Sequence, residues 1–146
     1  MVLWRISRYS NLVGMGGLRA SGRWHHAGRQ IVYLAENPPG ALLEVCVHTA
    51  SNDLPTDFTL LQVEGPNTAV PLIDIDNFPV DWTTNLIVTR GIGDKWIAGA
   101  TSVLLRVPSV IVPRTFNYLF NPSHSLAREF SITQKFTYPF DVRIKS

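Results

Sequence analysis

The chain has 146 residues, a length that suits one domain able to bury a core without disulfides or structural metal ions. Only 16% of the residues are charged and the net charge is +2, too small a surplus to indicate a nucleic-acid-binding protein. Cys46 is the only cysteine, so no intramolecular disulfide can form, and its apolar neighbours favour a buried, unreactive thiol.

No apolar run approaches the roughly 20 residues of a membrane span, and the first residues do not resemble a signal peptide, so we expect a cytoplasmic protein. The low charge also favours a surface covered by a partner, which includes the possibility of a homodimer.

Strand-like segments outnumber helical ones along the chain. From the amino end they are Val2–Ile6, Ile31–Ala35, Phe58–Val63, Val70–Ile75, Ser102–Val107, Phe116–Phe120, Ser131–Phe136 and Phe140–Ile144. One clear helix is expected to begin after Asn37, a good N-cap, and to run to about His48. Glycine-rich residues 11–22 are expected to form a loop, residues 84–99 one or two short helices, and residues 126–130 a helical turn. The pattern predicts a single α+β domain with a mixed or antiparallel sheet and few helices.

The front of the chain is locally basic. No acidic residue precedes Glu36, whereas five arginines do: Arg5, Arg8, Arg19, Arg23 and Arg29. Such a local positive field can steer a small anion even on a nearly neutral protein.

Arg23 and Tyr33 are the first two candidate site residues. A guanidinium binds phosphate through a forked pair of hydrogen bonds, and the neighbouring Gly22 would allow close backbone approach to a ligand. The alternative for Arg23 is a surface side chain stacked on Trp24. Tyr33 lies within an apolar strand, where a tyrosine commonly just finds one hydrogen-bond partner in the core.

Glu44 is the third candidate, in the middle of an otherwise apolar helix. Carboxylates are rarely buried unless they are paired or used in chemistry. The alternative is a solvated helix face on which His48, one turn later, pairs with Glu44.

Metal binding is not indicated. His25 and His26 are adjacent and cannot easily bind one ion, and no cysteine or histidine spacing supports a metal site. The stretch from Asn121 to His124 has the composition of an ordinary turn. Ser109 follows Pro108 at a predicted strand end, where its side chain could face a cleft.

Several of these stretches resemble the RES-domain toxins, over essentially the whole chain and in order. They are Gly17–His25, Ile31–Glu36, Ala41–His48, Gly91–Trp96, Leu105–Ser109, Asn117–His124 and Phe140–Arg143. The family is named for Arg, Glu and Ser, and Arg23, Glu44 and Ser109 stand at matching places. One departure is His25, where many relatives have asparagine.

The resemblance implies one RES domain over residues 1–146, with a fold similar to ADP-ribosyltransferases. It implies a toxin of a bacterial toxin–antitoxin pair whose partner is an Xre-like helix-turn-helix antitoxin. Such toxins consume NAD as a substrate, with no further cofactor, by breaking the nicotinamide–ribose bond; the acceptor is water, phosphate or a protein. The implied pocket residues are Arg23, Tyr33, Glu44, Ser109, Asn121 and His124.

The implied roles follow from side-chain chemistry. Arg23 would hold the pyrophosphate, Tyr33 would pack on nicotinamide or its ribose, and Glu44 would stabilise an oxocarbenium-like transition state. Ser109 would orient Glu44 or the ribose. Two other functions stay open: a non-enzymatic subunit that binds a nucleotide or a partner, and an RNA-cleaving toxin that uses His25 or His48 together with Arg23.

Overall fold

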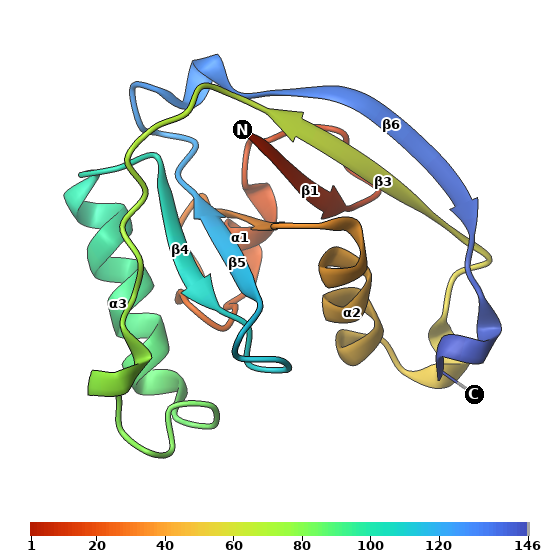
Figure 1. Ribbon diagram of the computed structural model, residues 1–146, viewed down its shortest axis with the longest axis horizontal. Coiled ribbons are helices and arrows are strands. Elements are labelled where there is room, and N and C mark those ends of the chain that lie inside the picture. The colour runs from red at the N-terminus through yellow and green to blue at the C-terminus, as the bar shows by residue number, and fades with distance from the viewer. Residues whose placement is uncertain (146) are drawn as a thin grey trace.

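A six-stranded sheet, antiparallel throughout, organises the chain in this computed structural model, which describes residues 1–145 (Figure 1). The strand order is β4-β5-β2-β1-β3-β6. The strands are β1 (Val2–Ile6), β2 (Val32–Ala35), β3 (Asp57–Glu64), β4 (Leu104–Pro108), β5 (Phe116–Phe120) and β6 (Ser131–Pro139). The helices are α1 (Met15–Arg19), α2 (Pro38–His48) and α3 (Leu86–Gly99), with short 3₁₀ turns at Ser51–Asp53, Ile75–Asn77, Ala127–Glu129 and Val142–Lys145. The predicted α+β class with few helices is confirmed.

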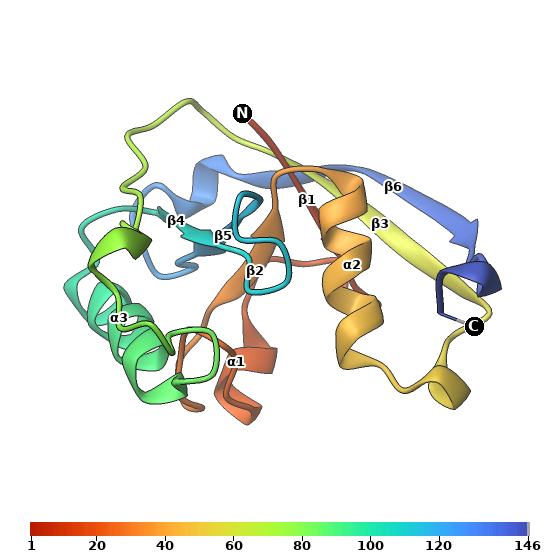
Figure 2. The same ribbon diagram turned by 60° about the horizontal axis from the view of Figure 1, so that its bottom comes forward.

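The two faces of the sheet carry separate parts of the core. Val32 and Leu34 of β2 belong to one apolar cluster, whereas Tyr33 of β2 and Ile31, just before the strand, pack in the other, as the alternation of side chains along a strand requires. Trp96 of α3 completes the second cluster. In Figure 2, α2 and α3 stand in front of the sheet with α1 between them.

Helix α2 begins and ends as its sequence dictates. The side chain of Asn37 accepts a hydrogen bond from the Gly40 amide at 2.7 Å, which confirms the predicted N-cap. At the other end, the ammonium group of Lys145 donates to the carbonyls of Cys46 and Thr49. A lysine that satisfies the last free carbonyls stabilises a helix terminus, so the end of the chain holds α2 in place. Cys46 is buried, as expected.

Two predicted strands are wrong. Residues 70–75 make only an isolated parallel bridge, between Leu72 and Arg106, because Pro71 has no amide hydrogen with which to extend the ladder. Residues 140–144 leave the sheet after β6, because the Asp141 carboxylate accepts a hydrogen bond from the Arg143 amide and starts a 3₁₀ turn.

The structure also refines two expectations about helices. The predicted loop at residues 11–22 contains the short helix α1, which Gly14 enters with a positive φ of 80°. Within residues 84–99 a single helix forms, α3 from Leu86 to Gly99, longer than the one or two short helices expected, and Ala100 ends it in the left-handed region. Across residues 1–145, no helix combines the length and apolar character needed to cross a bilayer.

Candidate functional site

A cleft of about 610 Å³ opens on the sheet face that carries Tyr33. Its walls come from α1 and the loop after it, from β1 and β2, from α2, and from the segment that follows β4. Arg23, Tyr33 and Glu44 all line it. The volume lies in the range of about 300–1,000 Å³ typical of small-molecule sites. The fold therefore brings the three candidates from the front of the sequence into one cavity.

Glu44 reaches this cleft with one carboxylate oxygen firmly held. Its Oε1 accepts a hydrogen bond from the Ser109 hydroxyl at 3.0 Å and another from the Asn117 side-chain amide at 2.9 Å. Its Oε2 lies 4.0 Å from Nε2 of the largely exposed His48. The predicted pairing with His48 therefore exists, but it is long, whereas the contacts to Oε1 set the orientation of the carboxylate. Oε2 is left as the oxygen available to a ligand.

Ser109 is buried and its hydroxyl is fully used. Its Oγ accepts hydrogen bonds from the amides of Ile111 and Val112, at 3.1 and 3.3 Å, while donating to Glu44. Its backbone amide donates to the Thr115 carbonyl at 2.8 Å, which closes the turn between β4 and β5. Ser109 thus acts on the carboxylate and not as a free nucleophile.

Asn117 is a site residue that sequence reasoning missed. It lies near the start of β5, where it pairs with Ala35 of β2, and it lines the cleft. The only signal in the sequence is a polar residue between Phe116 and Tyr118 in an otherwise apolar strand.

Tyr33 and His25 form a hydrogen-bonded pair beneath the cleft. The Tyr33 hydroxyl lies 2.7 Å from Nδ1 of His25 and accepts a hydrogen bond from the Trp24 amide at 3.1 Å. Nε2 of His25 faces the carbonyls of Ala20, at 3.0 Å, and Gly17, at 3.3 Å. Carbonyls only accept, so the imidazole proton is on Nε2 and Nδ1 accepts from Tyr33. The Tyr33 hydroxyl therefore donates its proton to His25, and the part of Tyr33 left to contact a ligand in the cleft is its ring.

Burial keeps both partners uncharged. It lowers the pKa of His25 and raises the pKa of Tyr33 far above its ordinary value. Gly22 lies so close that an added Cβ would stand 2.5 Å from the Tyr33 hydroxyl oxygen. The glycine thus makes room for Tyr33, where the sequence suggested room for a ligand.

His25 gives the stability of the protein a predictable pH dependence. Because its pKa is lowered in the folded state, the unfolded chain binds the proton more readily, so stability is lost as the pH falls below about 6.5 through the folded pKa. Thermal unfolding of the His25→Asn variant between pH 5 and 7 should show a weaker dependence on pH than the parent protein. Equal slopes for the two proteins would contradict the buried neutral imidazole.

Arg23 enters the cleft from the loop between α1 and β2. Its Nη1 donates to the Thr83 carbonyl at 2.6 Å. Its neighbour Trp24 is turned into the core, where its ring centre lies 6.3 Å from that of Phe78 and 6.4 Å from that of Trp82. Trp24 anchors the loop, and Arg23 lines the cleft.

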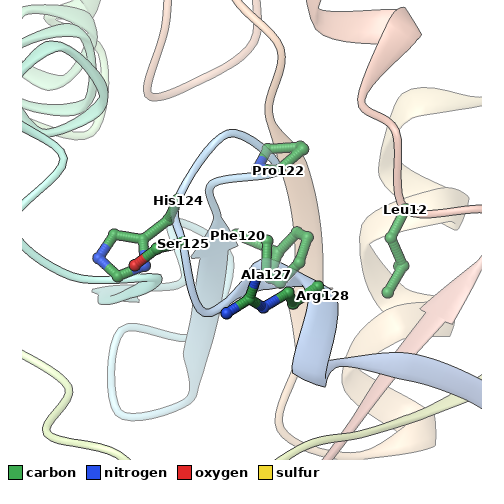
Figure 3. A pocket seen from close by; sticks show the side chains of 7 residues that line it. All are labelled: Leu12, Phe120, Pro122, His124, Ser125, Ala127 and Arg128. Carbon is green, nitrogen blue, oxygen red and sulfur yellow. The ribbon is translucent and has the colours of Figure 1, made fainter.

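Asn121 and His124 do not join this cleft. Asn121 is buried and its Oδ1 accepts a hydrogen bond from the Ser123 amide, while Nδ1 of His124 accepts one from the Leu126 amide. His124 lines a separate cavity of about 410 Å³, shown with its lining side chains in Figure 3. Asn121 follows the far end of β5, roughly 13 Å along the strand from Asn117. Their expected place in the pocket is corrected: both build the turn after β5.

Comparisons with known proteins agree with this architecture. The model of the RES domain family matches residues 2–141. The chain is 47% identical to Toxin Res of Pseudomonas putida over 134 residues, which cover 90% of this chain and 92% of that protein. It is 34% identical to Toxin Res of Yersinia enterocolitica, covering 99% and 100%, and 32% identical to the Prs ADP-ribosylating toxin of a Sphingobium species, covering 97% and 94%.

A solved structure shares the fold. The toxin–antitoxin complex MbcT–MbcA of M. tuberculosis contains a chain that matches 94% of this protein, and 84% of that chain, with a TM-score of 0.76 at 15% identity. The similarity shows that the two chains share one α+β fold. With the family model covering nearly the whole chain and Arg23, Glu44 and Ser109 gathered at one cleft, this protein belongs to the RES domain family of toxins.

Proposed function

We propose that this protein is the toxin of a bacterial toxin–antitoxin pair and that it consumes NAD by breaking the bond between nicotinamide and ribose. The observation that carries the proposal is the carboxylate of Glu44, held through Oε1 by Ser109 and Asn117 in the cleft that Arg23 and Tyr33 also line. The Sphingobium relative is named as an ADP-ribosylating toxin, which supports chemistry at the same bond.

Cleavage of this bond requires a site that binds NAD and stabilises positive charge on the ribose. When the C–N bond breaks, its electron pair goes to the pyridinium nitrogen, so nicotinamide leaves neutral and needs no general acid. The ribose carbon becomes an oxocarbenium-like cation, which the free Oε2 of Glu44 stabilises as carboxylates do in glycoside cleavage. An acceptor with a proton, such as water or phosphate, then adds to this carbon and releases the proton.

Arg23 and Tyr33 would hold the substrate in place. The guanidinium of Arg23 would bind the pyrophosphate, with one nitrogen still anchored on Thr83. The ring of Tyr33, immobilised by His25 and Trp24, would pack against the nicotinamide end. A rigid aromatic surface orders a flat ring at little entropic cost.

An antitoxin partner is part of the proposal. The MbcT–MbcA structure is a toxin–antitoxin complex of the same fold. Exposed apolar side chains gather on the two helices that flank the cleft, with Met15 and Leu18 on α1 and Leu43 and Val47 on α2. Such exposure favours a protein partner at this rim, and the resemblance makes that partner an Xre-like helix-turn-helix protein.

The test is to mix the purified protein with NAD and to identify the products by mass spectrometry, with and without phosphate. Free nicotinamide together with ADP-ribose, a phosphate adduct or protein-linked ADP-ribose would support the proposal and name the acceptor. Intact NAD under all of these conditions, with a folded protein, would refute it and favour a non-enzymatic binding protein. Nothing at His25 favours RNA cleavage, because both of its ring nitrogens are buried and hydrogen-bonded.

The two residues that hold Glu44, Ser109 and Asn117, can be tested one at a time. Ser109→Ala and Asn117→Ala each remove one hydrogen bond to Oε1, so each is expected to lower kcat about 10-fold, with a smaller change in KM for NAD. Steady-state kinetics of nicotinamide release measure both constants. Ser123→Ala, an exposed serine outside the cleft, serves as the control. If kcat were unaffected in both cleft variants, the orientation of Glu44 would not matter for turnover.

A further inference from the structure

One face of α3 lies directly behind the loop that carries Arg23. The hydroxyl of Thr89 donates to the backbone carbonyl of Arg23 at 2.7 Å, and Nε of Arg90 donates to the carbonyl of Gly22 at 2.8 Å. Thr89 is completely buried. The backbone on which the Arg23 side chain is mounted is therefore held by two side chains of one helix.

The next turn of α3 holds the following part of the same loop. Gly93 packs against the carbonyl of Trp24 so tightly that any Cβ would overlap it. The Asp94 carboxylate accepts hydrogen bonds from the His26 amide at 3.0 Å and from Nδ1 of the His26 ring at 2.6 Å, and it also lies 3.1 Å from Nε of Arg29. These contacts hold the pKa of Asp94 below its ordinary value.

The spacing of these residues explains how one helix does this. Thr89 and Gly93 are four residues apart, as are Arg90 and Asp94, so they form two adjacent rows on one helix face. The loop from residue 22 to residue 29 has no helix or strand of its own. Its conformation therefore depends on this face of α3 and on the burial of Trp24.

We propose that four residues of α3 form a clamp that positions Arg23 for the substrate: Thr89, Arg90, Gly93 and Asp94. This inference rests on the proposed function, in which Arg23 binds the pyrophosphate. It gives a role to the Gly91–Trp96 stretch, which the catalytic scheme leaves unused. Thr89 is a positioning residue: its hydroxyl acts on the substrate only through the backbone of Arg23.

The decisive pair of variants is Thr89→Val and Thr89→Ser. Valine keeps the shape of threonine and removes the hydroxyl, whereas serine keeps the hydroxyl and removes a methyl group. We expect Thr89→Val to raise KM for NAD about 10-fold, the equivalent of one buried hydrogen bond, with kcat nearly unchanged, and Thr89→Ser to keep the parental KM. An unchanged KM in Thr89→Val, or an equal rise in both variants, would overturn the clamp. Lys95→Ala, at an exposed neighbouring position on α3, is the control.

A second arm shows whether Thr89 acts through Arg23. In an Arg23→Ala background, Thr89→Val should have no further effect on KM for NAD, because the side chain that the clamp positions is gone. An additive effect of the two changes would contradict the proposal.

Hydrogen exchange of the amides of residues 22–27 separates failure of the clamp from failure of the proposed function. Without NAD, Thr89→Val should speed exchange in this loop while Thr89→Ser does not. If the parent protein consumed no NAD, the proposed function would fail, but faster loop exchange in Thr89→Val alone would still support the clamp. Equal exchange in all three proteins would refute it.

Discussion

Replacing Glu44 by glutamine should abolish NAD consumption, with a loss of at least about 10²–10³-fold in kcat, while the protein stays folded. The change removes the one carboxylate charge that the cleft presents to the developing cation. Ser109 and Asn117 both donate to Oε1, so the glutamine oxygen is expected to occupy that position. The amide NH₂ would then stand in the place of Oε2 and point a donor at a positive centre.

The control for this variant is Glu36→Gln. Glu36 also accepts a hydrogen bond through one carboxylate oxygen, from the Phe116 amide, but it does not line the cleft. We expect the Glu36→Gln variant to keep its activity. Circular dichroism and thermal unfolding should show that both variants keep the parental fold. Comparable losses in the two variants would point to a general structural effect and not to a role for Glu44 in the chemistry.

The second large effect is expected for Arg23→Ala. A hydrogen bond between two charged groups contributes roughly 1.5–3 kcal/mol, so the KM for NAD should rise about 10- to 150-fold. The effect on kcat should be smaller because Arg23 binds a part of the substrate that does not react. Arg23→Lys should recover only part of the loss, since an ammonium group cannot bind the pyrophosphate as a fork while also bonding the Thr83 carbonyl.

Arg8→Ala distinguishes a direct contact from the general positive field of the front of the chain. Arg8 is one of the five early arginines, is exposed, and does not line the cleft. Its removal lowers the net charge equally, so a field effect alone would raise KM by a similar factor in both variants. We expect a clear change only for Arg23→Ala.

Local signals in the sequence were sufficient for the elements that depend on local chemistry. The Asn37 cap and the prolines after it defined the start of α2, and an alternating pattern defined β3. The strand predicted at residues 70–75 failed because its apolar pattern resembles a strand while Pro71 prevents the ladder. Apolar pattern alone does not reveal which segments find a pairing partner.

The site could be predicted only in part, because its geometry depends on contacts distant in sequence. Arg23, Tyr33, Glu44 and Ser109 were candidates from their chemistry and position, the family resemblance joined them into one pocket, and the fold gathers them. Asn117 escaped notice because its importance arises from the pairing of β5 with β2, which turns it toward α2.

His25, the residue least explained by sequence, proves to be structural. It is buried, and its Nδ1 accepts the hydrogen bond that orients the hydroxyl of Tyr33. For Asn121 and His124 the composition of an ordinary turn was the better guide than the resemblance, because both side chains bond to neighbouring backbone amides.

The most direct test of the central claim is the rate of nicotinamide release from NAD by the parent protein and by Glu44→Gln, assayed side by side at equal folded concentration. We predict steady release by the parent and no release above the uncatalysed rate by Glu44→Gln. Release at equal rates by both proteins would contradict the role of Glu44, and intact NAD with the folded parent protein would contradict NAD cleavage itself.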